Sequence, residues 1–291
     1  MSKEQRYTII LLFAAVIWGF GFVAQRAAMD HMGPLVFNGI RFGLGGLSLI
    51  PMVLFIEKKD GFNKATLKAG LICGLVLFVA AALQQWGMAA TGSAAKTGFI
   101  TGLYIVLTPI LGMFMGRKTH KFVWVGAIFA TVGLYFIANP GELGLSLGVL
   151  ALLAGALAWS THILVIDRFA KEASPLGLSV VQCLVCAVPS LGAAFIFEDV
   201  QLVQISAGYI PVLYSALVSV CIAYTLQVLG QRHVAPGKSA IIFSLESVVG
   251  AGGEAFILGA FMDVRGYIGG ALIFAGIVVS QLKGCRKILK N

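Results

Sequence analysis

The chain has 291 residues, of which 59% are hydrophobic and only 11% charged, with a formal net charge of +9. A soluble domain is about 45–50% apolar and about 25% charged, so this composition excludes an ordinary soluble enzyme, a disordered chain and a coiled coil. Because a membrane-spanning helix takes roughly 20 apolar residues, ten of them would fill the chain and leave no room for a separate soluble domain.

Apolar stretches separated by charged residues or by Gly and Pro predict ten membrane-spanning helices. They cover residues 8–25, 35–56, 66–90, 94–116, 121–138, 146–166, 175–197, 207–230, 238–260 and 265–283. Only Thr91-Gly92-Ser93 divides the third stretch from the fourth. A β-barrel is excluded, because its strands would be segments of roughly ten residues with alternating polarity. No small-residue cleavage site follows the first stretch, so we expect a retained helix rather than a signal peptide.

The basic residues are distributed unequally between the two sides of the predicted bundle. With the N-terminus in the cytoplasm, seventeen Lys and Arg fall in cytoplasmic segments, and only Arg26, Lys96 and Arg265 fall outside. This bias follows the positive-inside rule and predicts a multi-pass plasma-membrane protein with both termini in the cytoplasm. It also explains the net positive charge without a nucleic-acid partner.

The second half of the chain repeats landmarks of the first. Trp18 and Pro34 recur at an offset of 141, and Gly126 and Gly133 at an offset of 143, as Trp159, Pro175, Gly269 and Gly276. The repeats, 8–138 and 146–283, each contain five predicted helices. Because five is odd, the second repeat enters the membrane from the opposite side, and inverted repeats of this kind are typical of transporters.

Several motifs resemble the EamA-type branch of the drug/metabolite transporter superfamily. They are Ala15-Val16-Ile17-Trp18-Gly19, the segment 98–104 with Pro109, Ser244-Leu245-Glu246, and the segments that begin with Gly126 and Gly269. The resemblance covers essentially the whole chain and implies secondary transport of small metabolites, often export of amino acids. The family commonly has Pro after Ser-Leu-Glu and Gly-Glu after the ninth helix, where this chain has Ser247 and Gly259-Ala260. A helix break at Gly259-Ala260 is therefore an open question.

Charged residues within predicted spans are the first site candidates. Each costs roughly 2.5–3.5 kcal/mol at a helix centre, so its presence implies a partner or a water-filled cavity. Glu246 and Glu254 lie about 80° apart on one helix and could line one wall of a cavity. They are candidates for proton coupling or for binding a substrate ammonium group, and Arg41 is a candidate for binding a carboxylate. The alternative is an ion pair between Arg41 and Glu246 that only stabilises the bundle.

Neutral polar and aromatic residues complete the candidate set. The glutamines offer hydrogen bonds to a polar ligand or between helices, the aromatic residues form either a cavity wall or packing contacts, and the histidine either carries protons or has a structural hydrogen bond. These residues are Gln84, Gln85, Gln182, Gln227, Trp18, Trp159, Tyr104 and His162. Gln182 occupies the repeat position of Arg41.

No motif in the chain predicts a nucleotide, cofactor or metal site. Gly237-Lys238-Ser239 resembles the end of a P-loop, but Arg232 stands where the first Gly should be. Cys183 and Cys186 have no second ligand pair nearby. We therefore expect a secondary active transporter, a monomer or homodimer, that exports a small metabolite such as an amino acid by alternating access, with protons as the candidate coupling ion. The alternatives are a lipid-carrier flippase and a membrane-embedded enzyme, which would need catalytic carboxylates or histidines at one interface.

Overall fold

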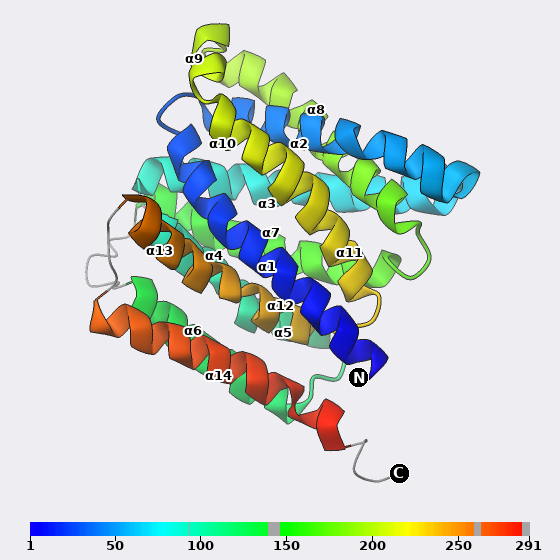
Figure 1. Cartoon of the computed structure of the whole chain (residues 1–291), viewed down its shortest axis with the longest axis vertical. Coiled ribbons are helices and arrows are strands. Elements are labelled where there is room, and N and C mark those ends of the chain that lie inside the picture. Colours follow the sequence, from blue (N-terminus) through cyan, green and yellow to red (C-terminus); the bar gives the residue numbers. More distant parts are fainter. Residues whose placement is uncertain (93, 139–145, 259–262, 287–291) are drawn as a thin grey trace.

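The computed structural model describes residues 1–92, 94–138, 146–258 and 263–286. Over these residues the chain forms helices and no strand, and the helices are arranged as one bundle (Figure 1). Nine helical segments in these ranges are long and apolar enough to cross a membrane, and a tenth, Lys121–Ile137, is apolar but shorter. The predicted fold class, an all-α membrane protein, is confirmed.

The first repeat contains five spans, of which the fourth is interrupted. Its elements are α1 (Lys3–Ala28), α2 (Pro34–Met52) with its continuations η1 (Val53–Glu57) and η2 (Lys58–Phe62), α3 (Lys64–Thr91), α4 (Ala94–Gly102), α5 (Tyr104–Phe114) and α6 (Lys121–Ala138). The division between α3 and α4 occurs where the sequence predicts it. Gly92 adopts a left-handed conformation, with φ of 63°, and its N–H bonds to the carbonyl of Met88, which is a usual way for a helix to end.

The second repeat has the same order of spans with two interruptions. Its elements are α7 (Leu147–Phe169), α8 (Pro175–Phe197), α9 (Leu202–Ala207), α10 (Tyr209–Leu213), η4 (Tyr214–Tyr224), α11 (Thr225–Gln231), α12 (Pro236–Phe243), α13 (Leu245–Leu258) and α14 (Val264–Arg286). Residues 259 and 260, where the ninth predicted helix ends, lie outside the described residues.

Three predicted spans are present but are not regular α-helices throughout. The segment 94–116 is interrupted at Leu103, the segment 238–260 at Ser244, and the segment 207–230 contains the π-helical turns of η4. The break at Ser244 forms although residue 247 is Ser and not Pro. The Ser244 hydroxyl donates to the carbonyl of Ile241 at 2.6 Å.

Two glutamates make equivalent contacts in the two repeats. Glu57, at the end of the second span, accepts hydrogen bonds of 2.9 Å from two backbone N–H groups in the first turn of α8. Glu198, which follows α8, does the same for two N–H groups in the first turn of α2, also at 2.9 Å. The glutamates are 141 residues apart, and α2 and α8 lie side by side (Figure 1). Each helix is therefore capped by the residue that follows its partner.

The predicted glycine repeats bring α6 and α14 into close contact. A Cβ at Gly126 would stand 2.6 Å from the carbonyl oxygen of Gly276, and one at Gly133 would stand 2.5 Å from that of Gly269. A Cβ at Gly276 or at Gly269 would stand at the same distances from the carbonyl oxygens of Gly126 and Gly133. These glycines let two backbones touch, which is how helices gain attraction in lipid.

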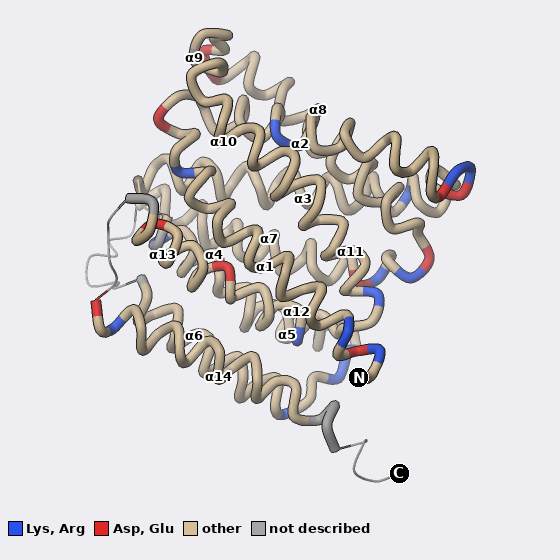
Figure 2. Tube along the Cα trace, viewed as in Figure 1, with Lys and Arg blue, Asp and Glu red and all other residues tan. Residues whose placement is uncertain are grey.

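The outer surface of the bundle is apolar along its length. Large side chains such as Phe55, Phe114 and Phe256 are more than four-fifths exposed, which an aqueous solvent would not tolerate over so wide an area. Figure 2 shows Lys and Arg mainly at the end of the bundle where both termini lie. This arrangement fits a bilayer around the helices.

Candidate functional site

A cavity lies between the two repeats. Its volume, measured as the space open to the centres of water molecules, is about 50 Å³, enough for several waters. Both repeats contribute to its wall. The lining residues are Trp18, Phe22, Gln25, Arg41, Gln84, Thr101, Tyr104, Trp159, Ile163, Ser219, Tyr224, Gln227, Phe243 and Glu246.

The interruptions of the spans place polar side chains in this cavity. Tyr104 begins α5 directly after the break at Leu103, and Glu246 lies in the first turn of α13 after the break at Ser244. The π-helical segment η4 presents Tyr224. Interrupted helices and π-helical turns occur often at functional sites, because they free backbone groups and redirect side chains.

Glu246 is the acid of the cavity. Its side chain accepts a hydrogen bond of 2.8 Å from the hydroxyl of Tyr104, and the residue is 7% exposed. Ten residues separate it from Pro236 at the start of α12, a rise of roughly 15 Å. A hydrocarbon core of about 30 Å that begins near Pro236 would place Glu246 about halfway across it.

Arg41 is the positively charged residue of the cavity, and its side chain contacts residues of its own helix. Its Nε donates to the side-chain oxygen of Asn38 at 3.0 Å, and its guanidinium lies 5.0 Å and 4.7 Å from the rings of Phe37 and Phe42. Among the residues that the structure describes, neither Arg41 nor Glu246 is in an ion pair. The alternative of an Arg41–Glu246 ion pair is therefore not what the structure shows.

Seven of the eleven predicted site residues line this cavity. They are Trp18, Arg41, Gln84, Tyr104, Trp159, Gln227 and Glu246. Their helices are distant in sequence, so the fold brings together side chains that hydropathy and repeat matching identify separately.

Four predicted site residues lie elsewhere. His162 and Gln182 are fully buried and share a hydrogen bond of 3.1 Å between α7 and α8. Gln85 donates to the backbone carbonyl of Gln25 at 3.4 Å. Glu254 lines a separate, smaller pocket of about 10 Å³. Three of these side chains therefore have one hydrogen bond between helices, as one of the two sequence-based interpretations expects, although Nδ1 of His162, Nε2 of Gln182 and Oε1 of Gln85 have no partner among the described residues.

Seven lining residues were not predicted, although most follow from helical periodicity. Each of the following lies three, four or seven positions from a predicted cavity residue on the same span, hence on the same face: Phe22, Gln25, Thr101, Ile163, Tyr224 and Phe243. Ser219 and Tyr224 both lie in the π-helical segment, where the ordinary 3.6-residue period does not apply. Tyr224, its last residue, is still three positions from Gln227, whereas Ser219 is eight positions away.

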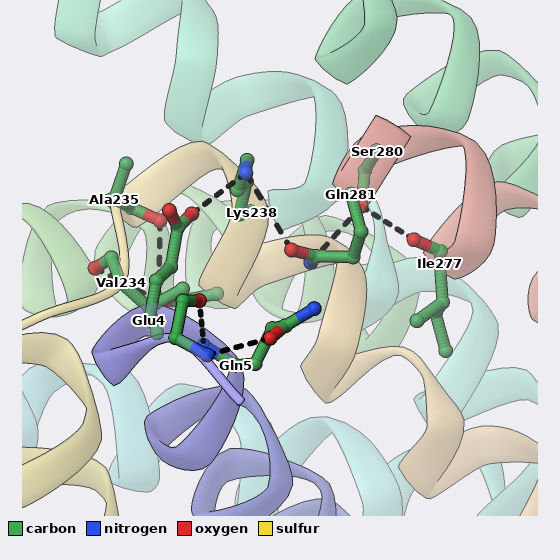
Figure 3. A network of polar contacts seen from close by, with 10 residues as sticks. Glu4, Gln5, Val234, Ala235, Lys238, Ile277, Ser280 and Gln281 are labelled. Carbon is green, nitrogen blue, oxygen red and sulfur yellow. Dashed lines mark hydrogen bonds and ion pairs between the residues drawn. The ribbon is translucent and has the colours of Figure 1, made fainter. Parts of the chain in front are cut away.

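Ionic contacts connect helices at the end of the bundle that carries the termini. Lys238, at the start of α12, donates to Glu4 of α1 at 2.7 Å and to Gln281 of α14 at 3.5 Å (Figure 3). Arg117 and Asp167 form a second ion pair, between the end of α5 and α7. These contacts tie together helices from both repeats below the cavity.

Comparison with known proteins agrees with this architecture. The EamA-like transporter family matches residues 5–139 and again 146–281. A solved crystal structure superposes with a TM-score of 0.82 over 97% of this chain and 98% of the other, at 19% identity, which shows a shared fold.

The similar proteins of known sequence are transporters. An uncharacterized transporter of Archaeoglobus fulgidus is 28% identical over 94% of this chain and 85% of its own length. A probable amino-acid metabolite efflux pump of Salmonella typhimurium is 24% identical over 96% and 95%. The aromatic amino acid exporter YddG of Salmonella typhimurium is 28% identical over 58% and 61%. These are transporters and not enzymes, and the chain, a multi-pass membrane transporter, belongs to the EamA-like transporter family.

Proposed function

We propose that this protein exports a small zwitterionic metabolite, such as an amino acid, across the plasma membrane by alternating access driven by protons. Both termini lie in the cytoplasm. The names of the relatives from Salmonella typhimurium, an aromatic amino acid exporter and a probable amino-acid metabolite efflux pump, support this substrate class. The basic residues around the termini support the orientation.

One observation carries the substrate class: a buried guanidinium and a buried carboxyl group line the same cavity and do not pair with each other. An α-amino acid carries the complementary pair of charges. Arg41 binds the substrate carboxylate, for which its planar array of donors is suited. Glu246 binds the ammonium group when it is ionised, while Tyr104 orients its side chain.

Alternating access follows from the position of the cavity between inverted repeats. Two inverted copies can exchange conformations, so that outward-open and inward-open states have similar energies. The contacts of Lys238 and of Arg117 connect helices at the end that the proposal places in the cytoplasm. They separate when the cavity opens to the cytoplasm to take up substrate.

Proton coupling is assigned to Glu246. Glu246→Gln keeps the size of the side chain and removes its charge, so the variant folds and inserts but loses transport driven by a pH gradient. Flux is measured in proteoliposomes with an imposed pH difference, with and without a protonophore. Glu172→Gln is the control, because Glu172 is an exposed carboxylate paired with Arg168 at the surface. Equal pH-driven flux in wild type and Glu246→Gln would refute the assignment.

The double variant Arg41→Gln/Glu246→Gln tests whether the two charges serve each other or the substrate. Separate roles in substrate binding predict that it transports no better than either single variant. Recovery of gradient-driven transport in the double variant would reject the functional roles and support a structural pair formed in another state.

The substrate is identified by thermal shift of the purified protein against a panel of amino acids, their amides and the corresponding amines. A ligand at 100 times its Kd stabilises the folded state by about 2.7 kcal/mol. Zwitterions are expected to shift the melting temperature more than amines or amides of the same side chain. The opposite order would contradict the proposed pairing of charges.

A further inference from the structure

Two tryptophans in equivalent positions of the repeats use their indole N–H groups differently. Trp18 and Trp159 are 141 residues apart and both line the cavity. The Nε1–H of Trp18 donates to the backbone carbonyl of Ser219 at 3.2 Å. The Nε1 of Trp159 is buried and, within the described ranges, has no hydrogen-bond partner. The symmetry of the fold is therefore broken at this atom.

The bond from Trp18 has a structural explanation. Ser219 lies in η4, where π-helical turns displace the regular backbone hydrogen bonds. The ring of Trp18 also lies edge to face with Tyr224 and Phe243, at centroid distances of 5.1 Å and 5.2 Å. Trp18 thus ties α1 to η4 and α12, and its only polar group is already in use.

Packing alone does not explain Trp159. Its ring stands edge to face with that of His162 at 5.7 Å, a contact that a phenylalanine would also make. A buried donor without an acceptor is unfavourable and rare in proteins. Among the residues that the structure describes, three other buried polar atoms of the cavity wall also lack partners: the side-chain oxygens of Gln25, Thr101 and Gln227.

We propose that the indole N–H of Trp159 donates a hydrogen bond to the carboxylate of the transported substrate, and that Trp159 thereby determines specificity. An indole N–H can only donate, so its partner must carry an acceptor. Of the two charged groups of a zwitterion, only the carboxylate accepts. The inference rests on the proposed function and adds to it a second carboxylate-binding residue beside Arg41.

The repeats supply a matched pair of variants for the test. Trp159→Phe and Trp18→Phe each remove one indole N–H and keep an aromatic ring on equivalent helices. The probes are L-phenylalanine and 2-phenylethylamine, which differ only in the carboxylate and suit an aromatic-lined cavity. Dissociation constants are measured by titration calorimetry in detergent.

Trp159→Phe is expected to raise the Kd for L-phenylalanine about tenfold, the equivalent of about 1.4 kcal/mol, and to leave that for 2-phenylethylamine unchanged. Trp18→Phe is expected to change both constants by the same factor and to lower the melting temperature, because the N–H that it removes bonds to the backbone of Ser219 and not to a ligand. An equal Kd for L-phenylalanine in wild type and Trp159→Phe would overturn the inference and mean that a water molecule satisfies this N–H.

A second measurement uses the wild-type protein and therefore does not depend on whether a variant folds. In ¹⁵N-labelled wild-type protein, the indole signal of Trp159 should move when L-phenylalanine is added, and that of Trp18 should stay. Movement of the Trp18 signal alone would refute the inference. If L-phenylalanine binds but the Trp159 signal does not respond, only this inference fails; if wild type binds no amino acid at all, the proposed function fails with it.

Discussion

The reciprocal caps on α2 and α8 predict a measurable loss of stability. Glu198 accepts hydrogen bonds from the backbone N–H groups of Leu35 and Val36, and Glu57 accepts them from those of Leu176 and Gly177. A hydrogen bond to a charged group contributes about 1.5–3 kcal/mol when buried, and a carboxylate near a helix N-terminus gains about 0.3–1 kcal/mol from the helix dipole. Both glutamates are partly exposed, so the lower values apply.

Glu198→Ala and Glu57→Ala are each expected to lower the free energy of unfolding by about 2 kcal/mol. Glu→Gln at the same positions keeps one acceptor oxygen and should cost about 1 kcal/mol. The 23 residues of α8 span roughly 35 Å, so the two caps are far apart, and the double Ala variant should lose the sum within about 0.5 kcal/mol. Reversible unfolding by SDS in mixed micelles measures these values.

The control is Glu172→Ala, which removes an exposed carboxylate whose only ion pair, within the described residues, is the surface pair with Arg168. Such pairs contribute about 0–1 kcal/mol. A loss at Glu198 no larger than at Glu172 would refute the capping argument. A double variant no less stable than one single variant would show that the two ends of the α2–α8 pair do not act independently.

Three further predictions follow from the fold. Single cysteines at Asp199 and Asn63 should differ in intact cells: an impermeant thiol reagent should label only position 199, and labelling of position 63 alone would reverse the proposed orientation. Gly133→Ala should lower the free energy of unfolding by about 1–3 kcal/mol, because the new Cβ would stand 2.5 Å from a backbone oxygen. Gly192→Ala should raise it by about 0.5–1 kcal/mol, because a Cβ there has no neighbour within 4 Å. Equal effects of the two variants in SDS unfolding would contradict this prediction. Burial and neighbouring basic side chains lower the pKa of His233 from 6.5. The unfolded chain therefore binds the proton more tightly, and the free energy of unfolding should fall as pH drops below 6.5. His233→Gln should remove that component of the pH dependence.

The membrane fold was predictable because lipid imposes one strong condition on every span. Backbone polar groups in hydrocarbon must bond within the chain, so long apolar stretches become helices. Hydropathy carries no information about interruptions, however. Leu103 and the segment Tyr214–Tyr224 are as apolar as their surroundings, and only tertiary contacts decide that the regular helix is broken there.

The site was predictable at the positions where an ionisable side chain lies in an apolar, membrane-spanning stretch. Arg41 and Glu246 stand out because each is costly in lipid, and both line the cavity. Buried amides and histidines are less informative, because either helix packing or a ligand can satisfy them. His162 and Gln182 bond to each other, which depends on how α7 and α8 are rotated about their axes, and a sequence does not specify that rotation.

Each charged residue of the cavity occurs in only one of the two repeats, although the helices that hold these residues are repeated. The position equivalent to Arg41 is Gln182, which is turned into a helix contact, and that equivalent to Glu246, at an offset of 143, is Leu103. A cavity that kept the two-fold relation would present two guanidinium groups and two carboxylates, whereas a zwitterion offers one partner for each. The helix caps and the glycine contacts are the same in both repeats, because both repeats pack in the same way. Recognition of an asymmetric ligand, by contrast, requires that the repeats differ at the residues that bind it.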